Sequence, residues 1–170
     1  MISKKLEKAL NEQINKELYS EYYYLGMAAW FNDKGLDGFA NFFKVQVQEE
    51  RFHAMKMYDY LVNRGGKVEL ETIQKPPQDF ESAEDIFKKA YKHEQFVTKS
   101  INDLMDLAIA ENDHATRNFL NWFIEEQVEE EASMDELLTK VRMIGSKGHG
   151  LLMLDGQLAQ RSFNPVDSKA

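Results

Sequence analysis

Apolar residues recur at alternating steps of three and four along four long segments of the chain. This heptad spacing places side chains on one face of an α-helix, so each segment predicts a helix with a single buried face. The expected helices span residues of about 4–34, 38–64, 83–111 and 114–144. All three prolines lie outside these segments, at Pro76, Pro77 and Pro165. The pattern therefore predicts an all-α protein.

The connections between the segments indicate how the helices pack. Two connections are short, which implies antiparallel neighbours, whereas residues 65–82 can run the length of a bundle. The second and third helices are therefore expected to be parallel. A shorter apolar stretch at 149–159 predicts a fifth helix. We expect one domain over residues 1–170: a four-helix bundle with a long crossover between helices two and three and a short C-terminal helix.

Each apolar face is interrupted near its middle by a polar residue that can bind metal. The interrupting residues are Glu17 on the first helix, Glu50 and His53 on the second, Glu94 on the third, and Gln127 and Glu130 on the fourth. Each unpaired buried carboxylate costs several kcal/mol, and together they would exceed the roughly 5–15 kcal/mol by which a domain is stable. We therefore expect a cation among them.

The residue types indicate which metal fits. The chain has no cysteine, which excludes a thiolate site. Carboxylates with one imidazole suit iron or manganese better than structural zinc. Glu50 and Glu130 can each supply two oxygens, and a bridging carboxylate would hold two metals about 3.5–4 Å apart. Because only His53 supplies nitrogen, the two positions should differ in affinity.

The overall charge and hydropathy narrow the range of partners. The net charge of −8 argues against a phosphate-binding surface, so no nucleic-acid partner is expected. No segment is apolar for the ~20 residues that a membrane span needs, and the N-terminal residues lack the apolar stretch of a signal peptide. We expect no membrane association and a cytoplasmic location.

Four short stretches contain most of the interrupting residues: Lys16 to Ser20, Gln48 to Ala54, Tyr91 to Glu94 and Trp122 to Gln127. Together these stretches resemble bacterial non-haem ferritins. The resemblance covers nearly the whole chain and implies a ferritin-like bundle that assembles into a hollow shell of about 24 subunits for iron storage. It also implies that Fe²⁺ is oxidised by O₂ or H₂O₂ and that Fe³⁺ is deposited as a mineral core.

The same resemblance assigns roles to residues of a ferroxidase centre. It implies that Glu17, Glu50 and His53 hold one iron, and that Glu50, Glu94 and Glu130 hold the second with Gln127 nearby. Tyr24 is similar to a redox-active tyrosine beside the centre. The candidates for a third iron site are Glu49, Glu126, Glu129 and Glu130.

The sequence also departs from one relative. Bacterioferritin has a second Glu-x-x-His pair, where this chain has Gln127-x-x-Glu130, and it binds haem through a methionine that aligns with Arg51. No haem is therefore expected.

Two other functions stay open at this point. One is a di-iron enzyme that oxidises an organic substrate or scavenges peroxide, which needs an apolar pocket beside the metals. The other is a non-enzymatic bundle that binds a partner through acids exposed in an open groove.

Overall fold

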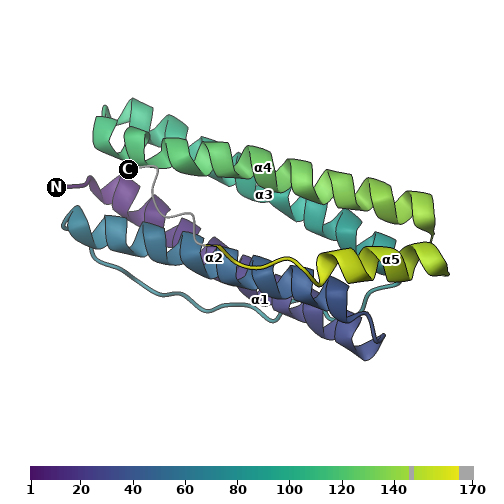
Figure 1. The fold of residues 1–170 in the computed structure, drawn as a ribbon. Helices are drawn as coiled ribbons and strands as arrows, with labels where there is room; N and C mark the ends of the chain where they lie inside the picture. Colours follow the sequence, from purple (N-terminus) through teal and green to yellow (C-terminus); the bar gives the residue numbers. More distant parts are fainter. Residues whose placement is uncertain (146–147, 165–170) are drawn as a thin grey trace.

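The computed structural model describes residues 1–145 and 148–164, and all regular structure in these residues is helical (Figure 1). The helices are α1 (Lys4–Asp33), α2 (Asp37–Asn63), α3 (Ala83–Ala110), α4 (His114–Ile144) and α5 (His149–Leu158). The all-α class is confirmed, and each helix begins and ends within one residue of the predicted bounds. Left-handed glycines follow α1, α2 and α4, with φ of +70° at Gly35, +74° at Gly65 and +72° at Gly145.

The chain path agrees with the predicted topology. In Figure 1, α1 and α2 run antiparallel, the crossover returns along the outside of the bundle, and α3 then runs parallel to α2. Helix α4 runs back beside α3, and α5 packs at one end against α2 and α4. The described residues that follow α5 run back alongside α2. The four long helices therefore each pass through the middle of the bundle.

The apolar core consists of two clusters, one toward each end of the bundle. The cluster nearer α5 contains packed aromatic rings: Phe31 and Phe39 stack with their centroids 5.0 Å apart, and Phe43 and Phe87 meet at a tilt with their centroids 5.3 Å apart. The other cluster is mainly aliphatic; its members include Leu6, Leu10, Leu61, Ile101 and Leu120. Because each of the four long helices contributes to both clusters, the polar residues that interrupt its buried face lie in a layer between them.

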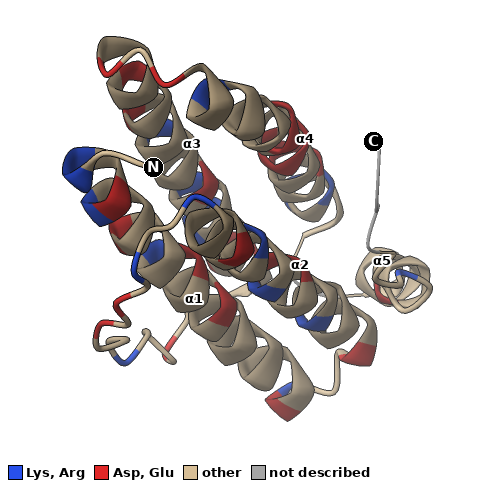
Figure 2. Cartoon of the chain, turned by 90° about the vertical axis from the view of Figure 1, so that its left-hand side faces the viewer, with Lys and Arg blue, Asp and Glu red and all other residues tan. Residues whose placement is uncertain are grey.

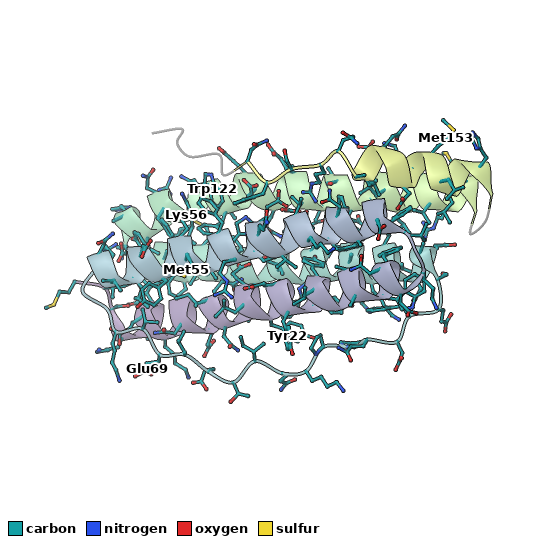
Figure 3. The ribbon with its side chains drawn as sticks, turned by 60° about the horizontal axis from the view of Figure 1, so that its bottom comes forward. Tyr22, Met55, Lys56, Glu69, Trp122 and Met153 are labelled. Carbon is teal, nitrogen blue, oxygen red and sulfur yellow. The ribbon has the colours of Figure 1, made fainter. Side chains whose placement is uncertain are left out.

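The outer surface carries both charge and exposed apolar groups. Acidic residues gather midway along α4 (Figure 2), where Glu125 and Glu129 are exposed and Glu126 and Glu131 are partly buried. On the outside of α1 and α2, Tyr22 is 46% exposed and Met55 is 41% exposed (Figure 3). Within the described residues, the helices are all too short or too polar to cross a membrane.

Candidate metal centre

Six polar side chains from the four long helices form the layer between the two apolar clusters. Their exposed fractions are 1% for Glu17, 2% for Glu50, 2% for His53, 1% for Glu94, 4% for Gln127 and 5% for Glu130. Such burial is rare for glutamate unless it is paired or binds a metal. The structure therefore places every residue predicted to interrupt an apolar face inside the core.

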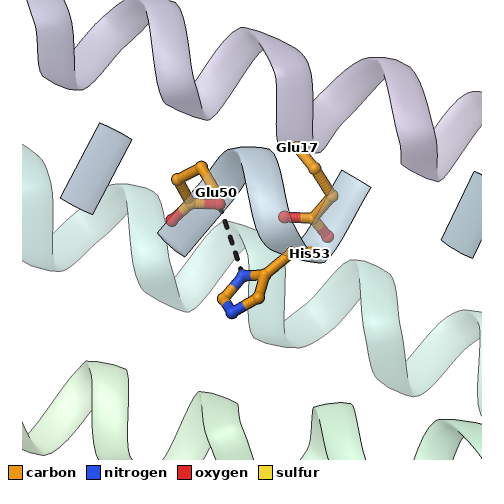
Figure 4. A group of neighbouring side chains, drawn as sticks. All are labelled: Glu17, Glu50 and His53. Carbon is orange, nitrogen blue, oxygen red and sulfur yellow. Dashed lines mark ion pairs between the residues drawn. The ribbon is translucent and has the colours of Figure 1, made fainter. Parts of the chain in front are cut away.

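Glu17, Glu50 and His53 form the first group of possible ligands (Figure 4). One ligand atom from each lies within 4.8 Å of the others, and Glu50 Oε2 lies 3.6 Å from His53 Nδ1. Glu17 Oε1 accepts a 2.8 Å hydrogen bond from Gln13. Within the part of the chain that the structure describes, Glu17 Oε2 and Glu50 Oε2 are buried without a hydrogen-bond partner. Since an unsatisfied buried carboxylate oxygen is costly, these two atoms fit a bound cation.

Glu94 lies in the same layer and receives hydrogen bonds from two candidate residues. The Tyr24 hydroxyl donates to Glu94 Oε1, and Gln127 Nε2 donates to Glu94 Oε2 at 3.2 Å. The Gln127 amide also donates to Thr98 Oγ1 at 3.2 Å. Tyr24 is fully buried, so its hydroxyl contacts the carboxylate layer rather than water.

A second group of possible ligands lies toward α4. One ligand atom each from His53, Glu126 and Glu130 lies within 4.8 Å of the others, and Glu126 is partly buried. Glu130 Oε2 accepts a 2.9 Å hydrogen bond from Gln46 Nε2, while Gln46 Oε1 is buried without a partner. His53 belongs to both groups, so the two groups are continuous.

The remaining third-site candidates differ in their surroundings. Glu49 is partly buried and accepts a 2.7 Å hydrogen bond from Arg161 Nη2. Glu129 is exposed and belongs to neither ligand group found among the described residues. The structure thus places Glu126 and Glu49 at the edge of the buried layer, and Glu129 outside it.

Burial and mutual repulsion perturb the carboxylates of the layer. Burial raises the pKa of Glu50 well above its ordinary value, and the charges of Glu94, Glu17 and Glu130 raise it further. Burial, reinforced by Glu130, raises the pKa of Glu94 to about 8. Hydrogen bonds from Tyr24 and Gln127 oppose that rise without cancelling it. The metal-free layer therefore retains protons that an arriving cation would displace.

These shifts predict how pH affects the metal-free protein. Between pH 4.5 and about 8, folded Glu94 keeps a proton that the unfolded chain releases. The contribution of Glu94 to the free energy of unfolding should therefore be largest below pH 4.5 and fall as pH rises through this window. We expect a loss of about 2–4 kcal/mol between pH 5 and pH 8, measured by denaturant unfolding with a chelator present.

The Glu94→Gln variant is the control for this pH dependence. It has no carboxyl group at this position, so its stability should vary less over the same pH range. A wild-type protein that gains more stability than the variant as pH rises would contradict the assigned pKa shift.

Sequence reasoning missed several polar residues that contact the candidate ligands, and Gln46 and Arg161 are two that hold carboxylates. Gln46 interrupts an apolar face between Phe43 and Glu50, and that position was the available signal for its contact with Glu130. Arg161 follows the last helix, where no periodicity applies, so nothing in the sequence pattern indicated its bond to Glu49. Both residues orient carboxylates of the layer.

Comparison with known proteins gives a consistent family assignment. The ferritin family profile, described as a ferritin-like domain, matches residues 7–144. The bacterial non-heme ferritin of Campylobacter jejuni is 44% identical over 91% of this chain and 93% of its own. That of Staphylococcus epidermidis is 43% identical over 96% and 99%. The open-pore ferritin of the hyperthermophilic archaeon Archaeoglobus fulgidus superimposes with a TM-score of 0.94 at 48% identity, over 95% of this chain and 100% of that chain. The chain therefore belongs to the ferritin family.

Proposed function

We propose that this protein stores iron, and that it oxidises Fe²⁺ with O₂ at the buried carboxylate layer before depositing Fe³⁺ as a mineral inside a shell of identical subunits. The observation that carries the proposal is the pair of unpartnered buried oxygens, Glu17 Oε2 and Glu50 Oε2, beside His53. Together with family membership, this arrangement favours a cation-binding reaction centre over a structural polar core.

Two Fe²⁺ ions are the proposed substrates of the centre. Glu17, Glu50 and His53 would bind the first, and Glu50, Glu94 and Glu130 the second, with Gln127 alongside. Glu50 suits the shared position because Glu17, from the first set, and Glu94, from the second, are both near enough to act on it electrostatically. A carboxylate shared in this way holds two metals about 3.5–4 Å apart.

The donor set favours loss of electrons from iron. Anionic oxygen ligands stabilise Fe³⁺ more than Fe²⁺, so each bound ion is predisposed to give up one electron. Two Fe²⁺, one O₂ and two protons yield two Fe³⁺ and one H₂O₂. Protons displaced from Glu50 and Glu94 when the iron binds are available for this step. Tyr24, whose hydroxyl contacts Glu94, is placed to exchange an electron with the centre.

The burial of the centre argues against an enzyme that oxidises an organic substrate and against a groove that binds a partner. Every proposed iron ligand is at most 5% exposed. Such a closed site admits a small ion and a diatomic molecule more readily than an organic substrate. An open groove for partner binding would also leave these acids exposed, which they are not.

Assembly into a shell of about 24 subunits is the second half of the proposal. It is supported by the exposed apolar side chains on the outside of α1 and α2, which are Tyr22, Leu25, Met55 and Val62. Exposed apolar groups on adjoining helices are typical of surfaces that bind another protein. The cytoplasmic location stays a prediction.

Anaerobic titration with Fe²⁺, followed by addition of O₂, tests the function. We expect about two or three Fe²⁺ bound per chain, rapid oxidation on mixing with O₂, and a particle of about 24 chains by size-exclusion chromatography with light scattering. No stoichiometric binding together with a small particle would refute both halves of the proposal.

A further inference from the structure

The segment after α5 is fastened to α2 by a side chain that reaches its backbone. Asn41 Nδ2 donates to the carbonyl oxygens of Leu158 at 3.1 Å and Arg161 at 2.9 Å. Phe163 adds an aromatic contact, with its ring centroid 6.3 Å from that of Phe52. Residues 159–163 therefore lie along the side of α2 that leads to the carboxylate layer.

Arg161 is the residue of this segment that reaches the carboxylates. Its Nη2 donates to Glu49 Oε2 at 2.7 Å, and its Nη1 donates to the carbonyl oxygen of Phe42 at 3.2 Å. The guanidinium also lies 4.3 Å from the centroid of the Phe42 ring. The side chains of Arg161 and Glu49 are only 26% and 23% exposed. A pair held by three contacts is better ordered than an ordinary surface ion pair.

The partner of Arg161 belongs to a larger acidic group. Glu126 and Glu130 lie close enough to Glu49 to act on it electrostatically, and both share a possible metal position with His53. Lys56 is also near Glu126, but its amine lies 4.4 Å from the Trp122 ring centroid, where it makes a cation–π contact (Figure 3). Among the described residues, Arg161 is thus the cationic group that is hydrogen-bonded to Glu49.

We propose that Arg161 competes with iron for Glu49, and so lowers the affinity of the third iron position that Glu49, Glu126 and Glu130 would form. This inference rests on the proposed function, because it requires that iron fill the inner positions. Glu49 Oε2 accepts the guanidinium, so a metal ion can take that oxygen only when Arg161 leaves it. Binding of the third ion therefore removes the Arg161–Glu49 contact and loosens the hold of residues 159–163 on α2.

This competition would set the order in which the iron positions fill. The inner positions have unpartnered oxygens and fill first. The outer position fills only when the Fe²⁺ concentration is high enough to displace the guanidinium. The C-terminal segment then responds to the iron load, although it contacts neither inner position.

The Arg161→Gln variant tests the proposal directly. Calorimetric titration with Zn²⁺ and anaerobic titration with Fe²⁺ should show the third ion bound about tenfold more tightly than in the wild type, with the first two unchanged. The matched control is Arg142→Gln, which removes the same charge from an ion pair with Glu84 on the surface. It should leave all three affinities unchanged, whereas Arg161→Lys should stay near the wild type.

Hydrogen exchange of the wild-type assembly supplies a readout that a purely structural arginine would not change. Amides of residues 159–163 should exchange faster once a third Zn²⁺ is bound, and not after the first two. Asn41→Ala loosens the same segment without removing the guanidinium, and it should raise the third affinity by a smaller factor.

Several outcomes would overturn the inference. Weaker binding of the third ion in Arg161→Gln would mean that Arg161 positions Glu49 for iron, and unchanged binding would mean that it has only a structural role. Absence of a third ion from both wild type and variant would also refute competition. If the wild type failed to bind the first two ions, the proposed function itself would be refuted.

Discussion

Replacing Glu50 by Gln is expected to slow Fe²⁺ oxidation by about a hundredfold or more, while making the metal-free protein more stable. The loss of activity follows because Glu50 is the carboxylate shared between the two proposed iron positions. The gain in stability follows because burial and three neighbouring carboxylates oppose its ionisation. We expect about 1–3 kcal/mol, since a neutral isostere removes a poorly compensated buried acid.

Stopped-flow absorbance on mixing with O₂ measures the oxidation, and denaturant unfolding with a chelator measures the stability. The matched control is Glu12→Gln, because Glu12 is on α1 with its side chain 56% exposed. That variant should keep both the oxidation rate and the stability of the wild type. If Glu50→Gln still oxidised Fe²⁺ rapidly, Glu50 could not be a ligand of the centre.

The His53→Ala variant separates the two effects. It should lose rapid oxidation as well, because it removes the one nitrogen ligand. Unlike Glu50→Gln, it should also destabilise the fold, since the His53 ring packs 5.5 Å from Trp122 and 6.0 Å from Phe123 and its removal leaves a cavity. If both variants lose activity while Glu50→Gln gains stability and His53→Ala loses it, the Glu50 carboxylate serves the chemistry of the centre rather than the stability of the fold.

Much of the fold could be predicted because a helix has a fixed period. Steps of three and four residues mark the face that is buried. In α1, the structure buries every position on the predicted buried face, from Leu6 to Phe31. The same regular rise brings the polar interruptions of four helices to one level. Glu17, Glu50 and Glu94 could therefore be placed together before any coordinates were known.

The contacts outside that periodicity could not be predicted. The bond from Arg161 to Glu49 depends on where a non-helical segment lies, and the sequence contains no repeat that determines it. The docking of α5 on α2 is a second example, because ten helical residues can pack through several faces. In the structure, α5 buries Leu151, Leu154 and Leu158. Tertiary packing, rather than local pattern, decides both contacts.

The close approach of α5 to α2 leads to the second large prediction. A Cβ atom added at Gly38 would lie 1.7 Å from the carbonyl oxygen of Asp155 and 2.5 Å from its carbonyl carbon. Both atoms are backbone, so Gly38→Ala must move α5. Leu36 provides no side-chain cap for α2, and Asp155 Oδ1 instead accepts a 2.9 Å hydrogen bond from the Phe39 amide. Moving α5 therefore also removes the cap.

We expect Gly38→Ala to lower the free energy of unfolding by about 2–4 kcal/mol, from overpacking and the lost cap together. The matched control is Gly156→Ala in α5, where an added Cβ meets nothing within 4 Å. It should be neutral or stabilising by up to about 1 kcal/mol, because alanine is the better helix former. Denaturant unfolding measures both, and hydrogen exchange of α5 shows whether the helix has moved.

Displacement of α5 should also reach the metal centre through the segment that follows it. Asn41 holds that segment and Arg161 pairs with Glu49 only while α5 stays docked on α2. Gly38→Ala should therefore bind the third ion more tightly, as Arg161→Gln does, while the inner positions keep their affinity. Gly38→Ala could instead destabilise the protein and leave the affinity for the third ion unchanged. That result would show that the segment stays on α2 independently of α5, and that Asn41 alone holds Arg161 beside Glu49.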